Sequence, residues 1–333
     1  MRTAPISRAL VIGAGVNGLS CALALRAAGV EVQMCFERPV RETTSAISAA
    51  FWYPFSVGPE AEVEAWSRDA LADFRRIEAL DEAHGVREHR VIELFPDSVG
   101  APGWREMLPD LRLARPDELR AGRKAGWVFT APVVDTSVYL PWLEARAQAA
   151  GVRFETTRIE ALDQALERCP VVINCSGLGA RELANDPRVY PIRGELVRTA
   201  SLDPNNEASF GVWLDEHADA LRYIVPRSAD TILGGTYEPE REDERLDPAA
   251  ADEIVRGCSQ LVPEIRASQQ LEHRVGFRPA RDEVRLELER RHTGQIVHNY
   301  GHGGAGVTLS WGCARAVLAL LELEPARMPW AHA

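Results

Sequence analysis

Three glycines near the N-terminus have the spacing of a turn that binds a dinucleotide. Gly13, Gly15 and Gly18 follow the apolar run 9–12 and lead into a second apolar run at 19–25. Gly13 permits a tight turn, Gly15 lets backbone approach a pyrophosphate, and Gly18 lets a helix pack closely on the preceding strand. The helix N-terminus then offers unpaired N–H groups and a positive dipole end to the phosphates. We therefore expect this chain to bind a dinucleotide.

An acidic residue completes this motif. Glu37 ends the next apolar run and stands nineteen residues beyond Gly18, near the spacing of about 20 at which a carboxylate reaches a ribose hydroxyl. Strand, glycine turn, helix, strand and acid together predict a Rossmann-like α/β unit. The alternative interpretation is an ordinary strand–turn–helix connection that holds no ligand.

Later segments extend this unit. A helix is expected at 136–150, because Asp135 stands before it as a suitable N-cap. The continuous apolar run 171–175 is typical of a buried strand. Apolar spacing also predicts helices over 59–83 and, near the end of the chain, over 309–323.

Period-two alternation of apolar and polar residues predicts a second kind of sheet. It occurs at 195–198, 223–226, 231–235 and 283–289, and it is typical of antiparallel strands with one covered face. In 283–289 three aliphatic side chains alternate with charged ones. We therefore interpret the carboxylates of that segment as a solvated strand face and not as an acid/base pair.

The order of these segments predicts an α/β protein of two domains. A Rossmann-like dinucleotide-binding domain encloses an inserted substrate domain built on an antiparallel sheet. The predicted ranges are 1–55, 136–190 and 295–333 for the first domain and 56–135 and 191–294 for the second.

Composition narrows the partners. The net charge of -11 argues against nucleic acid, and no apolar run approaches the roughly 20 residues of a membrane span. The first strand begins too early for residues 1–7 to be a secretory signal. The six cysteines have no metal-binding spacing. We expect reduced thiols, no metal and a cytoplasmic protein.

Six sequence blocks occur in one order across essentially the whole chain. They are VIGAGVNGLS at 11–20, WYP at 52–54, VINCSG at 172–177, YIVP at 223–226, GFRP at 276–279 and NYGHGGAG at 299–306. With these blocks the chain resembles the D-amino-acid oxidase family of flavoproteins. The resemblance implies FAD and hydride transfer from the substrate Cα to flavin N5. It also implies the products, a 2-oxo acid, ammonia and, from dioxygen, hydrogen peroxide.

The resemblance also implies the site residues. For the substrate it implies that Arg278 grips the carboxylate with a bidentate fork, that the Tyr223 hydroxyl meets the same carboxylate, and that the Gly304 carbonyl takes the amine. The residues expected around the cofactor are Gly13, Ala14, Gly15, Val16, Asn17, Gly18, Glu37, Arg38, Thr43, Thr44, Ser45, Ala50, Phe51, Gly303, Gly304, Gly306, Val307 and Thr308. The glycine-rich run 303–306 also suits an anion on its own account, because such a turn before a helix presents backbone N–H groups.

The sequence departs from the family at two positions. Asp219 stands where many members have a lid tyrosine, and Tyr237 stands where the D-aspartate-specific branch has an arginine. Without that cation a substrate carboxylate would be buried unpaired, so we expect neutral and apolar D-amino acids. The residues expected to line the side-chain pocket are Phe51, Tyr53, Trp213 and Tyr237. Strand alternation should point Arg222 away from it.

Several alternatives stay open at this point. A glycine or secondary-amine oxidase and a D-aspartate oxidase of the same fold share most of these blocks. An NAD-dependent dehydrogenase would not need the C-terminal glycine-rich block. A flavin-binding protein without catalytic activity and a homodimeric assembly are also left open.

Overall fold

The computed structural model describes residues 6–54, 57–202, 210–217, 220–324 and 328. The helices are α1 (Val16–Ala27), α2 (Thr44–Ile47), α3 (Glu60–Glu78), α4 (Thr136–Ala149), α5 (Leu162–Arg168), α6 (Ala180–Leu183), α7 (Pro248–Leu261) and α8 (Gly306–Leu320). The strands are β1 (Arg8–Ile12), β2 (Glu31–Phe36), β3 (Val86–Phe95), β4 (Arg112–Leu113), β5 (Ala125–Val134), β6 (Arg153–Thr156), β7 (Val171–Asn174), β8 (Tyr190–Ala200), β9 (Val212–His217), β10 (Ala220–Pro226), β11 (Asp230–Gly234), β12 (Glu238–Pro239), β13 (Gln270–Arg291) and β14 (Gly294–His302).

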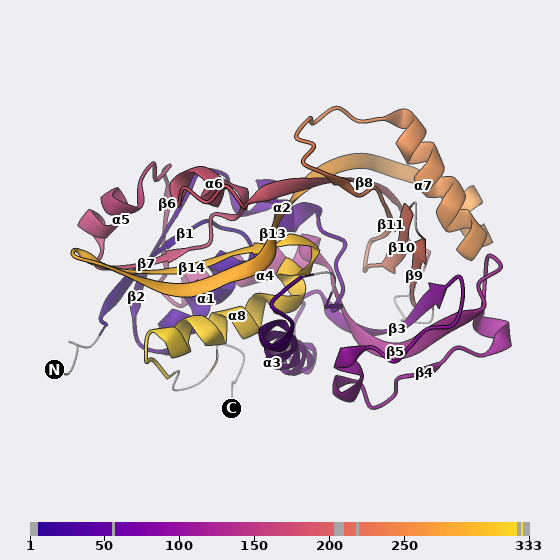
Figure 1. Ribbon diagram of the computed structural model, residues 1–333, viewed down its shortest axis with the longest axis horizontal. Coiled ribbons are helices and arrows are strands. Elements are labelled where there is room, and N and C mark those ends of the chain that lie inside the picture. The colour runs from indigo at the N-terminus through magenta and orange to yellow at the C-terminus, as the bar shows by residue number, and fades with distance from the viewer. Residues whose placement is uncertain (1–5, 55–56, 203–209, 218–219, 325–327, 329–333) are drawn as a thin grey trace.

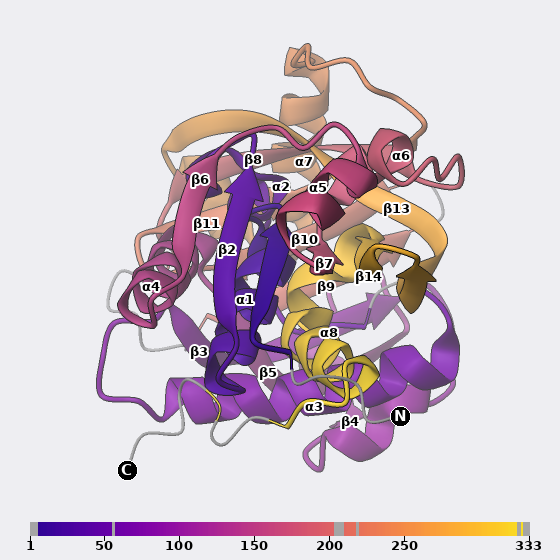
Figure 2. The same ribbon diagram turned by 90° about the vertical axis from the view of Figure 1, so that its left-hand side faces the viewer.

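One end of the sheet is parallel and forms the Rossmann-like part. Its strand order is β14-β7-β1-β2-β6, and Figure 2 shows β1, β2 and β6 from this end. The last residue of β1, Ile12, pairs with Cys35 of β2 and Asn174 of β7. The carboxyl ends of these strands therefore meet at one edge, where ligands of such sheets bind.

The other end of the sheet is mostly antiparallel. It continues from β8 through β11, β10, β9, β3 and β5 to β4, with β3 and β9 as a parallel pair. Helix α7 lies against its outer face in Figure 1. There, side chains of α7 such as Ile254 and Cys258 pack in one buried cluster with Trp213, Ile224 and Leu233.

Strand β13 joins the two ends of the sheet. Its first half, to Ala280, pairs with β8, and its second half pairs with β14. In Figure 1 it runs as one long ribbon across both parts of the molecule. The register shifts between Ala280 and Arg285, at the point where the strand changes partner.

Helices α1 and α8 pack beneath the parallel strands, with α4 beside α1, and α3 packs on α8 and on β3 and β5. Helix α1 is buried on nearly all sides because it lies between the sheet and α8. Helices α3 and α8 pack together closely at Gly312, where a Cβ atom would lie only 2.1 Å from the carbonyl oxygen of Trp66. Arg315 of α8 bonds the buried carboxylate of Asp73 in α3 at 2.7 and 2.8 Å.

The predicted fold class is confirmed as a mixed α/β fold with a large antiparallel part. Helix 136–150 is α4, and Asp135 caps it by accepting from the Ser137 N–H at 3.1 Å. Helix 59–83 is the shorter α3, and the last helix begins at Gly306 rather than 309. The glycine-rich run is therefore a 3-10 turn at Gly303–Ala305 followed by Gly306, the first residue of α8. The proposed division into two domains stays a prediction.

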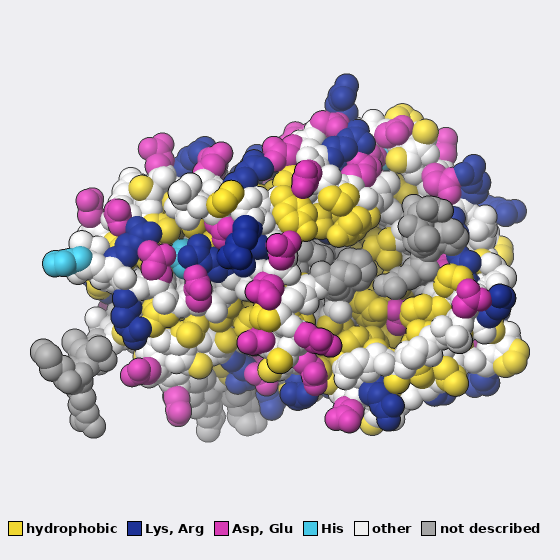
Figure 3. Space-filling model, in the orientation of Figure 1, with side chains coloured by type: hydrophobic (Ala, Val, Ile, Leu, Met, Phe, Trp, Pro, Cys, Tyr) yellow, Lys and Arg dark blue, Asp and Glu magenta, His cyan; other side chains and the backbone are white. Residues whose placement is uncertain are grey.

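All six cysteines are free and buried. Among the described residues no group of His, Cys, Asp and Glu could hold a metal ion, and no described helix is long and apolar enough to cross a membrane. Acidic and basic side chains are interspersed over the face in Figure 3. The cytoplasmic location and the homodimer stay predictions.

Candidate active site

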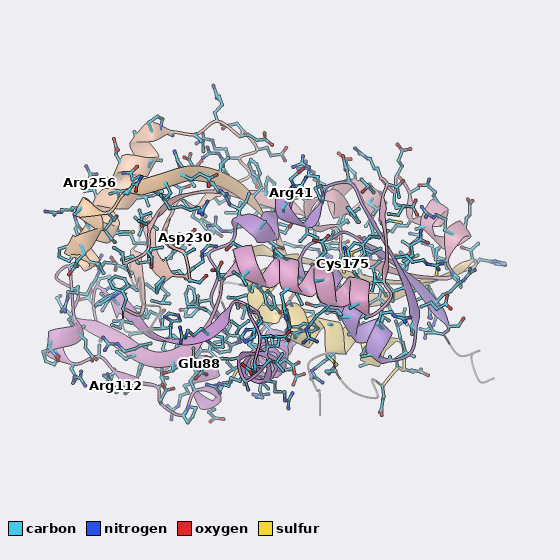
Figure 4. The ribbon with its side chains drawn as sticks, turned by 180° about the vertical axis from the view of Figure 1, so that it is seen from behind. Arg41, Glu88, Arg112, Cys175, Asp230 and Arg256 are labelled. Atoms are coloured by element: carbon cyan, nitrogen blue, oxygen red, sulfur yellow. The ribbon has the colours of Figure 1, made fainter. Side chains whose placement is uncertain are left out.

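A cavity of about 620 Å³ runs along the carboxyl ends of β1, β2 and β7. Most of the expected cofactor residues line it. They are Gly13, Ala14, Gly15, Val16, Asn17, Glu37, Arg38, Thr43, Thr44 and Ser45. Cys175, just after β7, also lines it; Figure 4 shows this residue in the Rossmann-like half.

The glycine turn forms the floor of this cavity. Gly13 has φ +102°, and a Cβ atom there would lie 2.4 Å from the carbonyl oxygen of Cys175. A Cβ atom at Gly18 would lie 1.9 Å from the carbonyl oxygen of Gly13, so Gly18 serves close packing and lines neither cavity. The N-cap of α1 is Gly15, which has no side chain of its own to cap the helix. Helix α1 thus begins directly at the cavity, as a pyrophosphate site requires.

Two small polar residues of α2 complete the turn. Ser45 Oγ accepts from the Val16 N–H at 3.1 Å, and Thr44 Oγ1 donates to the Phe277 carbonyl at 3.2 Å. A Cβ atom at Gly15 would lie 3.2 Å from Ser45 Oγ. The turn is therefore a tight cradle of backbone and hydroxyl groups, and it fits a diphosphate group.

Glu37 occupies the expected place at the end of β2. Its carboxylate lies 3.6 Å from the Arg158 guanidinium, and both side chains are more than half exposed. The acid that could accept from a ribose hydroxyl therefore already has a basic neighbour, which the sequence did not indicate.

A second, smaller cavity of about 130 Å³ adjoins the first and shares Val16 and Asn17 with it. The 3-10 turn before α8 and the first turn of α8 line it through Gly303, Gly304, Gly306 and Val307. Asn17 Nδ2 donates to the Gly306 carbonyl at 3.1 Å. The N-termini of α1 and α8, almost 290 positions apart, therefore meet at one place.

Arg278 reaches this second cavity from β13. Its Nη1 donates to the Thr236 carbonyl at 3.3 Å. Tyr223 is its neighbour: burial raises the pKa of the Tyr223 hydroxyl, and the nearby Arg278 opposes that rise. The structure thus brings Arg278 and Tyr223 together and places Gly304 on the cavity that Arg278 lines.

The segment 50–53 forms a wall between α8 and β5. Ala50 is buried and exchanges two backbone hydrogen bonds with Val134, at 2.9 and 3.3 Å. The Tyr53 N–H donates to Thr308 Oγ1 at 3.1 Å, and that hydroxyl donates to the Tyr53 carbonyl at 3.0 Å. Phe51 stands beside Tyr53, with ring centroids 5.7 Å apart. Ala50, Phe51 and Thr308 thus shape the wall and line neither cavity.

The buried Arg227 contacts the backbone next to this wall, at Ala49. Arg227 bonds Asp230 with two contacts of 2.7 Å and lies 3.4 Å from the Ala49 carbonyl. Burial alone would raise the pKa of Asp230, but hydrogen bonds and charge from Arg227 and Arg198 outweigh it and lower that pKa. Figure 4 labels Asp230 in the antiparallel half.

Two residues of this wall were not predicted. Trp104 lies 5.6 Å from the Tyr53 ring between centroids, and the Tyr53 hydroxyl donates to the carboxylate of Glu93. Glu93 is only 2% exposed. It pairs with Leu214 of β9, which in turn pairs with Tyr223, so the three residues share one face of the sheet. The alternation of apolar and polar residues in 86–95 could have indicated a strand with one covered face. It could not have indicated which residues of other segments pack against that face.

Two of the predicted pocket residues lie away from both cavities in the structure. Trp213 pairs with Ile224 and is buried in the cluster beneath α7, on the face opposite to Tyr223, because successive strand residues point to opposite faces. Tyr237 is 45% exposed and lines neither cavity. Arg222 faces α7 as expected, within 3.8 Å of Glu253. The prediction for Asp219 lies outside the described residues.

Comparison with known proteins now identifies the family. The sequence model of the FAD-dependent oxidoreductases matches residues 8–320. A D-amino-acid oxidase of Rubrobacter xylanophilus is 47% identical over 96% of this chain and 97% of its own length. The chain belongs to the D-amino-acid oxidase family of FAD-dependent oxidoreductases. A D-amino-acid oxidase of Streptomyces coelicolor, 40% identical over 93% and 95% of the two chains, is a further relative.

Solved structures agree on the fold. Glycine oxidase from Bacillus cereus has a TM-score of 0.75 at 18% identity, with 95% of both chains covered. L-alpha-glycerophosphate oxidase from Mycoplasma pneumoniae, whose structure contains FAD, has a TM-score of 0.70 at 12% identity, with 99% of both chains covered.

Proposed function

We propose that this member of the D-amino-acid oxidase family deaminates neutral and apolar D-amino acids, using FAD and dioxygen. The observation that carries the proposal is that Arg278 and Gly304 line one cavity, which adjoins the glycine cradle, and that Tyr223 lies beside Arg278. A guanidinium, a phenol and a backbone carbonyl are the groups needed to fix the carboxylate and the amine of one amino acid.

The chain's own residues position the substrate. Arg278 pairs with the carboxylate, the protonated Tyr223 hydroxyl donates to it, and the Gly304 carbonyl accepts from the amine. FAD, when bound, supplies the acceptor for the hydride from Cα and passes the electrons to dioxygen. When the carboxylate, the amine and the Cα–H bond of the substrate each have a fixed direction, only one direction remains for the side chain. Only one enantiomer therefore fits the site. Such orientation can contribute about 7–11 kcal/mol to lowering the barrier.

No side chain need act as a base in this scheme. His302 is buried beside the cavities, and burial lowers its pKa to about 4. Its Nε2–H donates to Asn299 Oδ1 at 3.0 Å. His302 is therefore neutral and fixed, and we assign it to the wall of the site. The substrate amine gives up its proton on or before binding.

The cofactor is assigned to the predicted first domain. The cradle at 13–17, the hydroxyls of Thr44 and Ser45, and Glu37 would hold its ADP half. The start of α8 at 303–307 would face the other end, where the positive end of a helix dipole stabilises negative charge. The inserted substrate domain would supply Arg278 and Tyr223.

Side-chain preference is assigned from the wall of the site. Phe51 and Tyr53 present aromatic rings, and Glu93 accepts from Tyr53. The carboxylate of an acidic substrate side chain near this wall would face the carboxylate of Glu93 instead of a cation. Two like charges in a buried site repel each other strongly. We therefore place D-aspartate among the poor substrates.

A substrate panel tests this proposal. Peroxide formation by the FAD-loaded protein would be measured with D-valine, D-alanine, D-aspartate, glycine, sarcosine and L-valine. We expect kcat/KM for the two neutral D-amino acids to exceed that for D-aspartate and glycine at least tenfold, with no turnover of L-valine. A preference for D-aspartate would contradict the assignment of the wall. A preference for glycine or sarcosine would instead assign the chain to the amine oxidases of this fold.

A further inference from the structure

We infer that Gly194 and Gly234 are positioning residues that seat the two substrate-binding side chains. Gly194 lies on β8 and Gly234 on the adjacent β11. Together we call them the glycine shelf. The inference rests on the proposed function, because it concerns how Arg278 and Tyr223 acquire the geometry that a carboxylate requires.

The guanidinium of Arg278 lies directly on Gly194. A Cβ atom at Gly194 would be 2.2 Å from Nη1, 2.7 Å from Nη2 and 2.8 Å from Cζ of Arg278. These distances are far shorter than van der Waals contact, so any side chain at 194 would displace the guanidinium. Arg278 pairs in register with Ile192, and its side chain therefore leans along β8 to reach the glycine.

The ring of Tyr223 lies on Gly234 in the same way. Tyr223 pairs with Gly234 across β10 and β11. A Cβ atom at Gly234 would be 1.9 Å from Cζ and 2.3 Å from the hydroxyl oxygen of Tyr223. Both substrate-binding side chains therefore lie against neighbouring strands that lack side chains at these two positions, Tyr223 with the face of its ring and Arg278 with the Nη1–Nη2 edge of its guanidinium.

A backbone brace fixes Arg278 on the shelf. The Thr236 carbonyl accepts from Arg278 Nη1 at 3.3 Å. Thr236 itself is held to β8, because the Glu195 N–H donates to its Oγ1 at 2.9 Å and its own N–H donates to the Glu195 carbonyl at 3.2 Å. Gly194 thus leaves room for the Nη1–Nη2 edge of the guanidinium, and the Thr236 carbonyl holds Nη1 in place.

This arrangement makes a definite prediction for Gly194→Ala. The atoms in conflict belong to the free end of a long side chain, so the protein should fold and bind FAD while the guanidinium moves aside. A bidentate contact depends on the plane of the fork, and a displacement of about 1 Å can cost about 100-fold in rate. The change should therefore weaken carboxylate binding and leave the stability of the protein unchanged.

The test compares Gly194→Ala with Gly100→Ala in the FAD-loaded protein. Gly100 is exposed and has open space around its Cβ position. The readouts are FAD content, Tm, KM and kcat with D-valine, and the Kd of benzoate from the perturbation of flavin absorbance. We expect at least a tenfold rise in KM and in the benzoate Kd for Gly194→Ala alone, with Tm and FAD content unchanged.

A double-mutant cycle shows whether the effect acts through Arg278. In an Arg278→Lys background the planar fork is already lost, so adding Gly194→Ala should raise the benzoate Kd less than twofold further. An unchanged benzoate Kd in the single variant, a failure of that variant to fold, or full additivity would overturn the inference. If the unaltered protein neither oxidises D-valine nor binds benzoate, the proposed function itself fails, and that outcome is distinct from these three.

Discussion

At the scale of single residues, the site depends on side chains whose types alone do not mark them. Arg278 is one of 38 basic residues and Tyr223 one of six tyrosines, and only the resemblance to a family drew attention to them. Trp213 shows the opposite case. Its type suited an aromatic pocket, but the pairing of β9 with β10 turns it toward α7. A shift of one residue in the pairing of a strand moves each side chain to the other face of the sheet. The sequence alone does not determine which face Trp213 occupies.

Substituting Arg278 tests the principal residue assignment. Arg278→Lys keeps the charge but loses the planar fork, so KM for D-valine should rise at least tenfold and kcat should fall, while FAD content stays the same. Arg222→Lys is the matched control, because Arg222 lies on the opposite face of the sheet, near Asp215 and Glu253. Steady-state kinetics on both variants provide the measurement. Equal kcat/KM values for Arg278→Lys and the unaltered protein would remove Arg278 from the site.

At the scale of elements, the sequence located the strands and helices better than their contacts. The glycine turn and α1, the cap of α4 and the buried strand β7 all follow from local patterns. The start of α8 did not, because the apolar spacing predicted a helix from 309, whereas the chain forms a 3-10 turn at Gly303–Ala305 and enters the helix at Gly306. The hydrogen bonds between Thr308 and Tyr53 join segments more than 250 residues apart. No local pattern predicts such a contact.

Thr308 tests the connection between α8 and the wall. Thr308→Val preserves shape but removes the hydroxyl that accepts from the Tyr53 N–H and donates to its carbonyl. Losing these two partly buried bonds should lower the free energy of unfolding by about 1–3 kcal/mol. It should also weaken FAD binding, because the wall and the glycine-rich start of α8 would separate. Urea unfolding and FAD titration measure both effects, and Thr308→Ser should restore them. Equal stability of the Val and Ser variants would contradict this role.

At the scale of the whole molecule, one sheet carries both halves of the site. The long β13 pairs with β8 in the antiparallel part and with β14 in the parallel part, so Arg278 on this strand is held rigidly relative to the glycine cradle. The two kinds of sheet were predicted from their periodicity. Their fusion through one strand was not, and neither was the parallel pairing of β3 with β9, because strand order depends on contacts between distant segments.

Buried histidines make the whole molecule sensitive to acid. Burial lowers the pKa of His302 to about 4, and it also lowers the pKa of His84 and His298. The unfolded chain then binds protons below about pH 6.5 that the folded chain does not accept, so stability is lost as the pH falls from there toward 4. His302 alone should account for about 2 kcal/mol between pH 7 and pH 5.

Urea unfolding of FAD-loaded protein at these two pH values measures this loss. His302→Gln should reduce the difference by about 2 kcal/mol, whereas His292→Gln, at an exposed position, should leave it unchanged. An identical pH dependence of the free energy of unfolding in both variants would contradict a lowered pKa of His302 in the folded protein.

The most direct test of the central claim is anaerobic mixing of the FAD-loaded protein with D-valine and, separately, with L-valine. The visible absorbance of the flavin reports hydride transfer without any contribution from reoxidation. We predict complete loss of the oxidised flavin band with D-valine, none with L-valine, and peroxide when air is admitted. If neither D-valine nor any other neutral D-amino acid bleaches the flavin, or if both enantiomers do so equally, the assignment of Arg278, Tyr223 and Gly304 as the groups that orient the substrate is contradicted.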